Sequence, residues 1–169
     1  MHRFSIEVNY MIRFDVLKVD LKKLVFSLFL TLGAGILSSV FTGDVQSVYQ
    51  TLNKPFYLPP QLFPIVWTIL YILMGISFYL FWNAEGGDKE KGYRYFFIQL
   101  FLNFFWTIIF FGFRRFGFAV IWILLMIVFI CLTILEFYKV DKKAAYLLIP
   151  YLLWTLFATY LTVYIWLAN

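Results

Sequence analysis

The sequence predicts an all-α membrane protein that crosses the bilayer as a bundle of five helices. Of its 169 residues, 63% are hydrophobic and only 14% are charged, whereas a soluble domain has about 45–50% apolar and about 25% charged residues. Apolar stretches long enough to span recur along the chain, since about 20 residues cross a hydrocarbon core of about 30 Å. Long apolar runs without period-2 alternation exclude barrel strands, so each span must be a helix.

These stretches divide the chain into a short arm and one membrane domain. Residues 1–23 are expected to form a cytoplasmic N-terminal arm, and residues 24–169 the five-helix domain. The first span follows Lys22 and Lys23 as in an uncleaved signal anchor, and Pro64 suits the first turn of the second span. The expected spans are residues 24–41, 63–82, 93–113, 116–138 and 144–168.

Basic residues are distributed unevenly between the two sides of the membrane. Eleven of the fourteen Lys and Arg residues lie on the side of the N-terminus, and only Lys54, Arg114 and Arg115 lie on the other. Because cytoplasmic segments carry the excess of Lys and Arg, we expect the N-terminus inside and the C-terminus outside. The net charge of +5 therefore reflects membrane topology and some attraction to lipid, rather than nucleic-acid binding.

The scarcity of titratable side chains excludes several classes of chemistry. His2, the only histidine, lies outside the bundle, and Cys131 is the only cysteine, so no metal site and no intramolecular disulfide is expected. Glu136 is the one carboxylate within a span, near its inner end and close to Lys139. A bundle without a mid-membrane charge lacks the groups that coupled transporters and conventional enzymes use.

Several spans carry a distinctive face. The first has a stripe of small residues, which predicts close helix packing and is also a candidate interface between two copies: Ser27, Thr31, Gly35 and Ser39. Three others place aromatic rings beside amide or hydroxyl groups: Trp67, Tyr71, Gly75 and Phe78; Gln99, Asn103, Trp106, Thr107 and Phe110; and Tyr151, Trp154, Ala158 and Thr162. Such faces serve either as interhelical contacts or as the walls of a pocket for a flat, mostly apolar ligand.

The connection between the first two spans contains Pro55, Pro59 and Pro60. Proline fixes φ and disfavours helix in the residue before it, so we expect a stiff, extended loop. A connection of about twenty residues is longer than two neighbouring helices need. We therefore interpret it as a lid over the outer mouth of the bundle.

From about Val25 to Asn169 the sequence resembles the translocator protein family, also called tryptophan-rich sensory proteins or peripheral-type benzodiazepine receptors. The loop carries the matching residues Tyr49, Leu52, Lys54, Pro55, Pro59 and Pro60. The second span matches at Val66-Trp67-Thr68, Leu70-Tyr71 and Met74-Gly75. The third matches at Gln99, Leu100, Asn103 and Trp106, and the fifth at Pro150-Tyr151-Leu152, Trp154 and Phe157-Ala158-Thr159.

This resemblance implies a dimeric receptor or sensor in a bacterial cell membrane that binds porphyrins, haem or other flat hydrophobic molecules as ligands, with no required cofactor. Tyr49 would cap the pocket, and Trp67 and Trp154 would face the ligand. The candidate ligand-binding residues are Tyr49, Pro59, Trp67, Tyr71, Asn103, Trp106, Thr107, Phe110, Trp154 and Ala158. Two alternatives stay open, a light-dependent porphyrin-degrading enzyme with Trp67 and Trp154 as its catalytic residues, and a carrier of porphyrins or other hydrophobic small molecules.

The sequence departs from the family at several positions. Val48 and Tyr57 replace loop tryptophans, and Thr162 replaces an asparagine, which removes an amide from the predicted pocket floor. Animal members are associated with cholesterol through a basic motif at the end of the fifth span. This chain has no Lys or Arg after Lys143, so that site is absent.

Overall fold

The computed structural model describes residues 19–169, so most of the predicted N-terminal arm lies outside the described part of the chain. Within these described residues, five helical segments are long and apolar enough to cross a membrane, which confirms the predicted all-α fold class. Most run slightly beyond their predicted bounds. They are α2 (Leu21–Thr42), α4 (Leu62–Asn83), α5 (Glu90–Thr107) with the π-helical turn η1 (Ile108–Gly112), α6 (Phe116–Val140), and α7 (Lys142–Leu147) followed by α8 (Ile149–Ala168).

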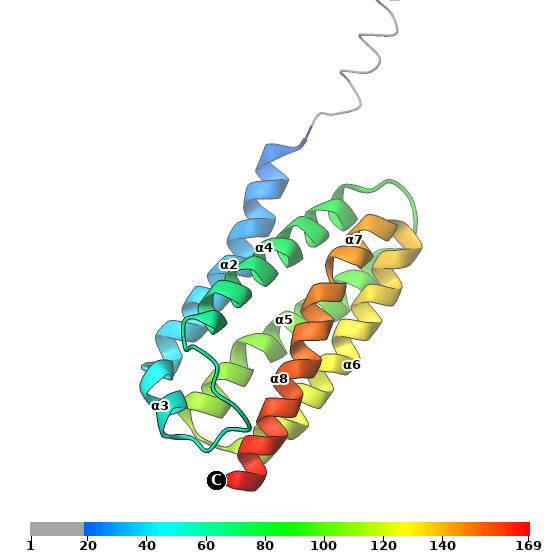
Figure 1. Cartoon of the computed structure of the whole chain (residues 1–169). Coiled ribbons are helices and arrows are strands. Elements are labelled where there is room, and N and C mark those ends of the chain that lie inside the picture. The colour runs from blue at the N-terminus through cyan, green and yellow to red at the C-terminus, as the bar shows by residue number, and fades with distance from the viewer. Residues whose placement is uncertain (1–18) are drawn as a thin grey trace, which may run out of the picture.

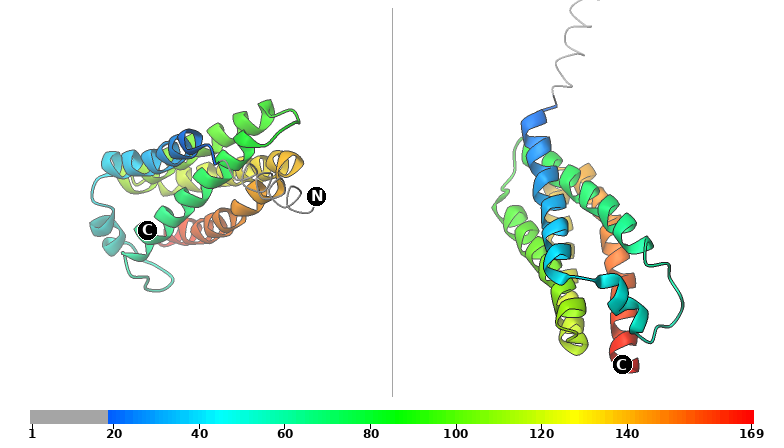
Figure 2. Two further views of the ribbon diagram at one scale, coloured as in Figure 1. Left: turned by 90° about the horizontal axis from the view of Figure 1, so that it is seen from above. Right: turned by 90° about the vertical axis from the view of Figure 1, so that its left-hand side faces the viewer.

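Figures 1 and 2 show an elongated bundle with two different ends. At one end, the short helix α3 (Val45–Thr51) and the following loop cross between α2 and α8, close to the C-terminus. We call this the lid end, and residues 44–61 the lid. At the other end, residues 84–89 connect α4 to α5, and α7 lies beside them. We call this the hairpin end.

Aromatic rings fill the bundle at the hairpin end. Phe81 and Phe137 stack with centroids 3.9 Å apart and planes 6° apart, and Phe78 stacks on Phe96 at 4.5 Å. All four rings are buried. Stacked rings therefore pack the bundle at the hairpin end.

The small-residue stripe of α2 packs against α4, as predicted. Ser27 and Thr31 are buried, and the Thr31 hydroxyl donates a hydrogen bond to the Tyr71 carbonyl at 2.8 Å. A Cβ added at Gly75 would lie 3.1 Å from the Cα of Leu28, so glycine permits the close approach of the two helices. Because α4 covers this part of the stripe, it is not available as an interface between copies.

Local structure differs from the sequence predictions in two places. The fifth span is interrupted at Leu148, where α7 ends and α8 begins, because Pro150 has no N–H and its ring clashes with the carbonyl four residues earlier. The lid is not extended throughout, because Asp44 starts the helix α3 by accepting a hydrogen bond from the Ser47 N–H at 3.1 Å.

Candidate ligand-binding site

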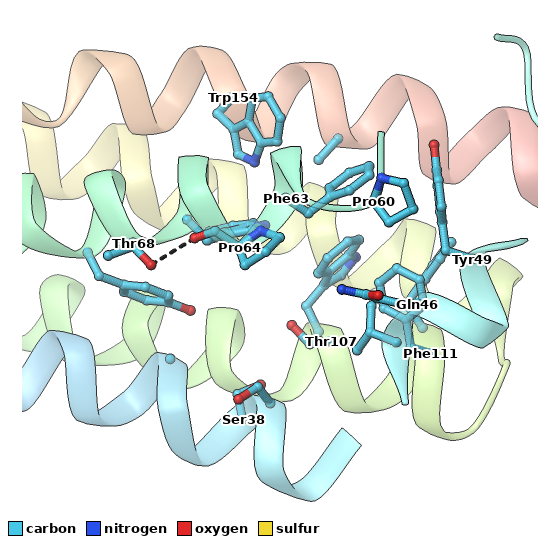
Figure 3. A pocket seen from close by; sticks show the side chains of 18 of the residues that line it. Ser38, Gln46, Tyr49, Pro60, Phe63, Pro64, Thr68, Thr107, Phe111 and Trp154 are labelled. Carbon is cyan, nitrogen blue, oxygen red and sulfur yellow. Dashed lines mark hydrogen bonds between the residues drawn. The ribbon is translucent and has the colours of Figure 1, made fainter. Parts of the chain in front are cut away.

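A cavity of about 600 Å³ lies inside the bundle at the lid end. Figure 3 shows side chains from α2, α3, α4, α5 and α8 around it, including Ser38, Tyr49, Thr68, Thr107 and Trp154. Among the described residues that line it, Asp44 is the only charged one. Apart from Asp44, the walls are thus uncharged, mostly apolar and rich in aromatic rings, a composition typical of sites for small apolar ligands.

Tyr49 on α3 covers the cavity from the lid. Its side chain is buried and meets the Phe63 ring edge to face, with centroids 4.9 Å apart. Burial raises the pKa of the Tyr49 phenol above its ordinary value of 10.0, so the hydroxyl stays protonated near neutral pH. At the start of the same helix, the Ser47 N–H holds the pKa of the exposed Asp44 carboxyl below 3.8.

Two further contacts hold the lid in place. The Lys54 ammonium donates hydrogen bonds to the carbonyls of Tyr49 and Gln50 at the C-terminal end of α3, and it lies 4.4 Å from the centroid of the Tyr49 ring. A cation at this position satisfies free carbonyls and complements the helix dipole. The Asn53 N–H donates to the Asn169 amide oxygen at 2.9 Å, and the Asn169 amide nitrogen donates to the Asn53 carbonyl at 3.1 Å. The lid is thereby fastened to the end of α8.

Aromatic rings close the side of the cavity between α4 and α8. The Trp67 ring lies 5.7 Å from the Tyr71 ring and 6.2 Å from the Tyr151 ring, and Phe63 lies 6.2 Å from Trp154. On α5, Trp106 stacks on Phe110 at 5.3 Å and 20°. A flat ligand in this cavity would therefore meet rings from at least three helices.

Asn103 joins three helices beneath the cavity. Its amide oxygen accepts a short hydrogen bond from the Tyr71 hydroxyl on α4, and its amide nitrogen donates to the Tyr151 hydroxyl on α8 at 3.1 Å. All three side chains are buried. Asn103 therefore forms the floor of the site as a structural connection between helices.

Three hydrogen-bond donors on the cavity residues have no partner among residues 19–169, the part of the chain that the structure describes. The Tyr49 hydroxyl, the Trp106 indole nitrogen and the Trp154 indole nitrogen are all buried and unpaired. Figure 3 shows the Trp154 nitrogen directed toward the cavity. Because a buried donor without an acceptor is costly, these groups favour a ligand that carries acceptor atoms. The Gln99 amide, deeper in α5, is also buried and unpaired, although it does not line the cavity.

Eight of the ten predicted site residues line the cavity. They are Tyr49, Trp67, Tyr71, Trp106, Thr107, Phe110, Trp154 and Ala158. Asn103 lies below them because both of its amide groups bond to tyrosines. Pro59 is exposed and Pro60 lines the cavity in its place, since successive side chains of an extended segment point in opposite directions.

The contribution of α2 to the site was not expected from the sequence. Gly35, Ser38 and Ser39 line the cavity. A Cβ at Gly35 would overlap the Tyr71 ring, so glycine leaves the space that this ring occupies. Gly35 and Ser39 belong to the small-residue stripe. The sequence could therefore have indicated that this stripe lines a cavity as well as packing against a helix.

The fold and the site define an integral membrane protein with a partly open, mostly uncharged pocket, rich in aromatic rings, beneath a lid. The TspO/MBR family profile matches residues 26–167, and the chain belongs to this family. It is 39% identical to the tryptophan-rich protein TspO of Archaeoglobus fulgidus over 153 residues, which cover 89% of this chain and 99% of that protein. It is 43% identical to the Chlorobaculum tepidum protein of the same name over 136 residues (78% and 86%). The human translocator protein is 38% identical over 149 residues (85% and 88%).

Proposed function

We propose that this protein is a membrane receptor or sensor that binds porphyrins, or related flat intermediates of tetrapyrrole metabolism, in the cavity beneath the lid. The observation that carries the proposal is the combination of a mostly uncharged cavity of about 600 Å³, rich in aromatic rings, with three buried, unpaired donors on its lining residues. The cavity volume falls in the range of about 300–1,000 Å³ that is usual for small-molecule sites. Ring faces would contact the macrocycle, and the donors would pair with its acceptor atoms.

The energetics favour binding by burial rather than by charge. Three aromatic contacts at about 0.5–1.5 kcal/mol each supply a few kcal/mol, whereas a micromolar site needs about 8 kcal/mol. Burial of the macrocycle's apolar surface must supply the remainder. We expect porphyrin carboxylates to lie at the polar mouth near Lys54, whose ammonium also holds the C-terminal end of α3.

The test is a titration of the purified protein in the dark with protoporphyrin, haem and an isoquinoline ligand. Replacing Trp67 and Trp154 together by Phe should weaken protoporphyrin binding about tenfold, which is about 1.4 kcal/mol. It should also reduce the quenching of tryptophan fluorescence by the ligand. Trp82→Phe is the matched control, because Trp82 lies at the hairpin end and does not line the cavity. Unchanged affinity and quenching in the double variant would show that the ligand binds elsewhere.

A second candidate function is light-dependent oxidation of the bound porphyrin, with dissolved dioxygen as the oxidant that accepts the electrons. It is favoured by the position of Trp67, whose ring lies within 6.2 Å of both the Tyr71 and Tyr151 rings and can exchange electrons with an excited ligand. Defined products that form in the light and are lost in the Trp67→Phe or Trp154→Phe variant would support it. Bleaching at the rate of free dye would exclude it. The carrier function stays a prediction, and protein-dependent porphyrin flux into vesicles is its test.

Three further expectations belong to the same proposal. The distribution of Lys and Arg favours an N-terminus inside and a lid outside in a bacterial cell membrane. The resemblance to the family favours a homodimer. Labelling of a cysteine introduced at the exposed Tyr57 of the lid, by a reagent that does not cross the membrane, tests the orientation.

A further inference from the structure

A second hollow lies on the outside of the bundle, between α4 and α8 on the side of the lid. It measures about 640 Å³, and we call it the α4–α8 groove. Its ten lining residues are Leu58, Leu62, Val66, Ile69, Leu70, Leu73, Pro150, Leu153, Trp154 and Phe157. Ile69 and Leu153 are 52% and 61% exposed, so the groove opens away from the bundle.

The groove exists because side chains, rather than close backbones, join α4 to α8. Phe63 meets Trp154 across the gap at 6.2 Å, and Trp67 meets Tyr151 at the same distance. Pro150, in the first turn of α8, forms part of the lining. A shallow channel is left outside this layer of rings, and Trp154 and Phe157 line both the channel and the cavity.

The groove lacks the polar side chains that bound water would need. Nine of the ten lining side chains are hydrocarbon, and Figure 3 shows the nitrogen of the tenth, Trp154, on the cavity side of its ring. A bound water needs about 2–4 polar partners, which this lining does not offer. An empty groove would forfeit the dispersion energy of its walls. In a bilayer, the hydrocarbon of the lipid tails needs no polar partners and restores dispersion contacts to the walls of the groove.

The dimensions of the groove match one lipid tail. Along α4 the lining runs from Leu62 to Leu73, which at about 1.5 Å per residue is about 16 Å. This is close to half of the hydrocarbon core of about 30 Å, the depth of one leaflet. The groove also begins at the lid end, where the headgroup of a lipid in that leaflet would lie.

We propose that the α4–α8 groove is a binding site for one acyl chain of a membrane phospholipid from the leaflet at the lid end. The chain packs against the outer faces of Trp154 and Phe157, the two residues that separate it from the cavity. It thereby completes the wall of the ligand site from the lipid side. This proposal is independent of which molecule occupies the cavity.

The test uses the full chain reconstituted in vesicles of phosphatidylcholine that carries a diazirine in the middle of one acyl chain. The protein is extracted and washed in detergent, so that loosely associated lipid is removed, and is then irradiated. Mass spectrometry of peptides locates the adducts. We expect about one retained lipid per chain, with adducts in residues 58–73 and 150–157.

Two pairs of substitutions distinguish the groove from the general lipid-facing surface. Val66→Phe and Ile69→Phe place a ring in the groove and should lower adduct formation about tenfold, since the ring displaces about two methylenes of the tail. Val128→Phe and Ile121→Phe make the same changes on exposed positions of α6, which line neither hollow, and should retain the lipid. Circular dichroism establishes that each variant is folded, and dark binding of protoporphyrin to the same samples reports separately on the cavity.

Three results would overturn the proposal. One is a washed protein that retains no lipid, and another is a set of adducts spread over the exposed face of α6. The third is full retention in both groove variants. Because protoporphyrin binding is measured on the same samples, failure of the groove site and failure of the cavity site give different results.

Discussion

Gly75 lies in a close contact between α4 and α2, and Gly75→Ala tests whether this contact determines the stability of the bundle. The added Cβ would lie 2.8 Å from the Thr31 hydroxyl, 2.9 Å from Leu28 Cδ2 and 3.1 Å from Leu28 Cα. The Leu28 Cδ2 atom can rotate away, but the backbone cannot. The Thr31 hydroxyl cannot move without weakening its hydrogen bond to the Tyr71 carbonyl. We therefore expect the two helices to separate by a few tenths of an ångström.

The expected change in the free energy of unfolding is the sum of two destabilising contributions and one stabilising contribution. Overpacking costs about 1–3 kcal/mol, and the interhelical hydrogen bond adds about 0.6 kcal/mol if it is lost. Alanine recovers about 1 kcal/mol of helix propensity relative to glycine. The net loss should be about 1–2 kcal/mol, which lowers the unfolding temperature by about 2–8 °C for a chain of this size.

Thermal unfolding in detergent, followed by circular dichroism, measures this loss, and Gly33→Ala is the control. A Cβ at Gly33 meets nothing within 4 Å, so this variant gains propensity without a clash and should be as stable as the parent or more so. If Gly75→Ala and Gly33→Ala unfold at the same temperature, close packing of α2 on α4 does not limit stability, and the reasoning is refuted.

Three other predictions concern the floor and the lid. Asn103→Leu leaves two buried tyrosine hydroxyls without their partner and should cost about 1–3 kcal/mol in the same unfolding assay, whereas an unchanged unfolding temperature would contradict the role of the amide. Asn169→Ala removes the two hydrogen bonds that the Asn169 side chain makes with the Asn53 backbone and leaves the one from the Asn53 side chain to the Ala168 carbonyl. Hydrogen exchange of the Asn53 amide should accelerate about tenfold, and unchanged exchange would show that the lid is held elsewhere. The pKa of Asp44 is lowered in the folded state, so its cap on α3 is present above pH 3.8 and is lost as the pH falls through the folded pKa. The protection of the Ser47 amide against hydrogen exchange, taken relative to the intrinsic exchange rate at each pH, should fall in that acidic range in the parent protein and stay unchanged in Asp44→Asn.

The sequence predicted the helices well because each has a strong local cause. Apolar runs of about twenty residues must form helices in lipid. The face of α4 was also predictable, since Trp67 and Tyr71 are separated by four residues and must lie on one side of a helix. Both residues line the cavity.

Features that depend on contacts between segments could not be predicted in the same way. Asn103 was an equally good candidate for lining a pocket or for joining helices, and only the positions of the Tyr71 and Tyr151 hydroxyls decide between them. Pro59 and Pro60 have the same local preferences, so which one faces the cavity depends on how the lid crosses the bundle. The end of α3 is likewise set by a lysine three residues beyond it, which donates to the final carbonyls.

Because Asn103 ties three helices together below the cavity, the cavity should accept changes in the breadth of a ligand more readily than changes in its length. Below the cavity, α4, α5 and α8 are tied together by hydrogen bonds, and deepening the space would require breaking a satisfied buried network. Above that level, α4 and α8 are separated by rings such as Phe63 and Trp154, and widening the space requires only rotation of side chains. Ligand selection should therefore be strict in length along the membrane normal and permissive in breadth.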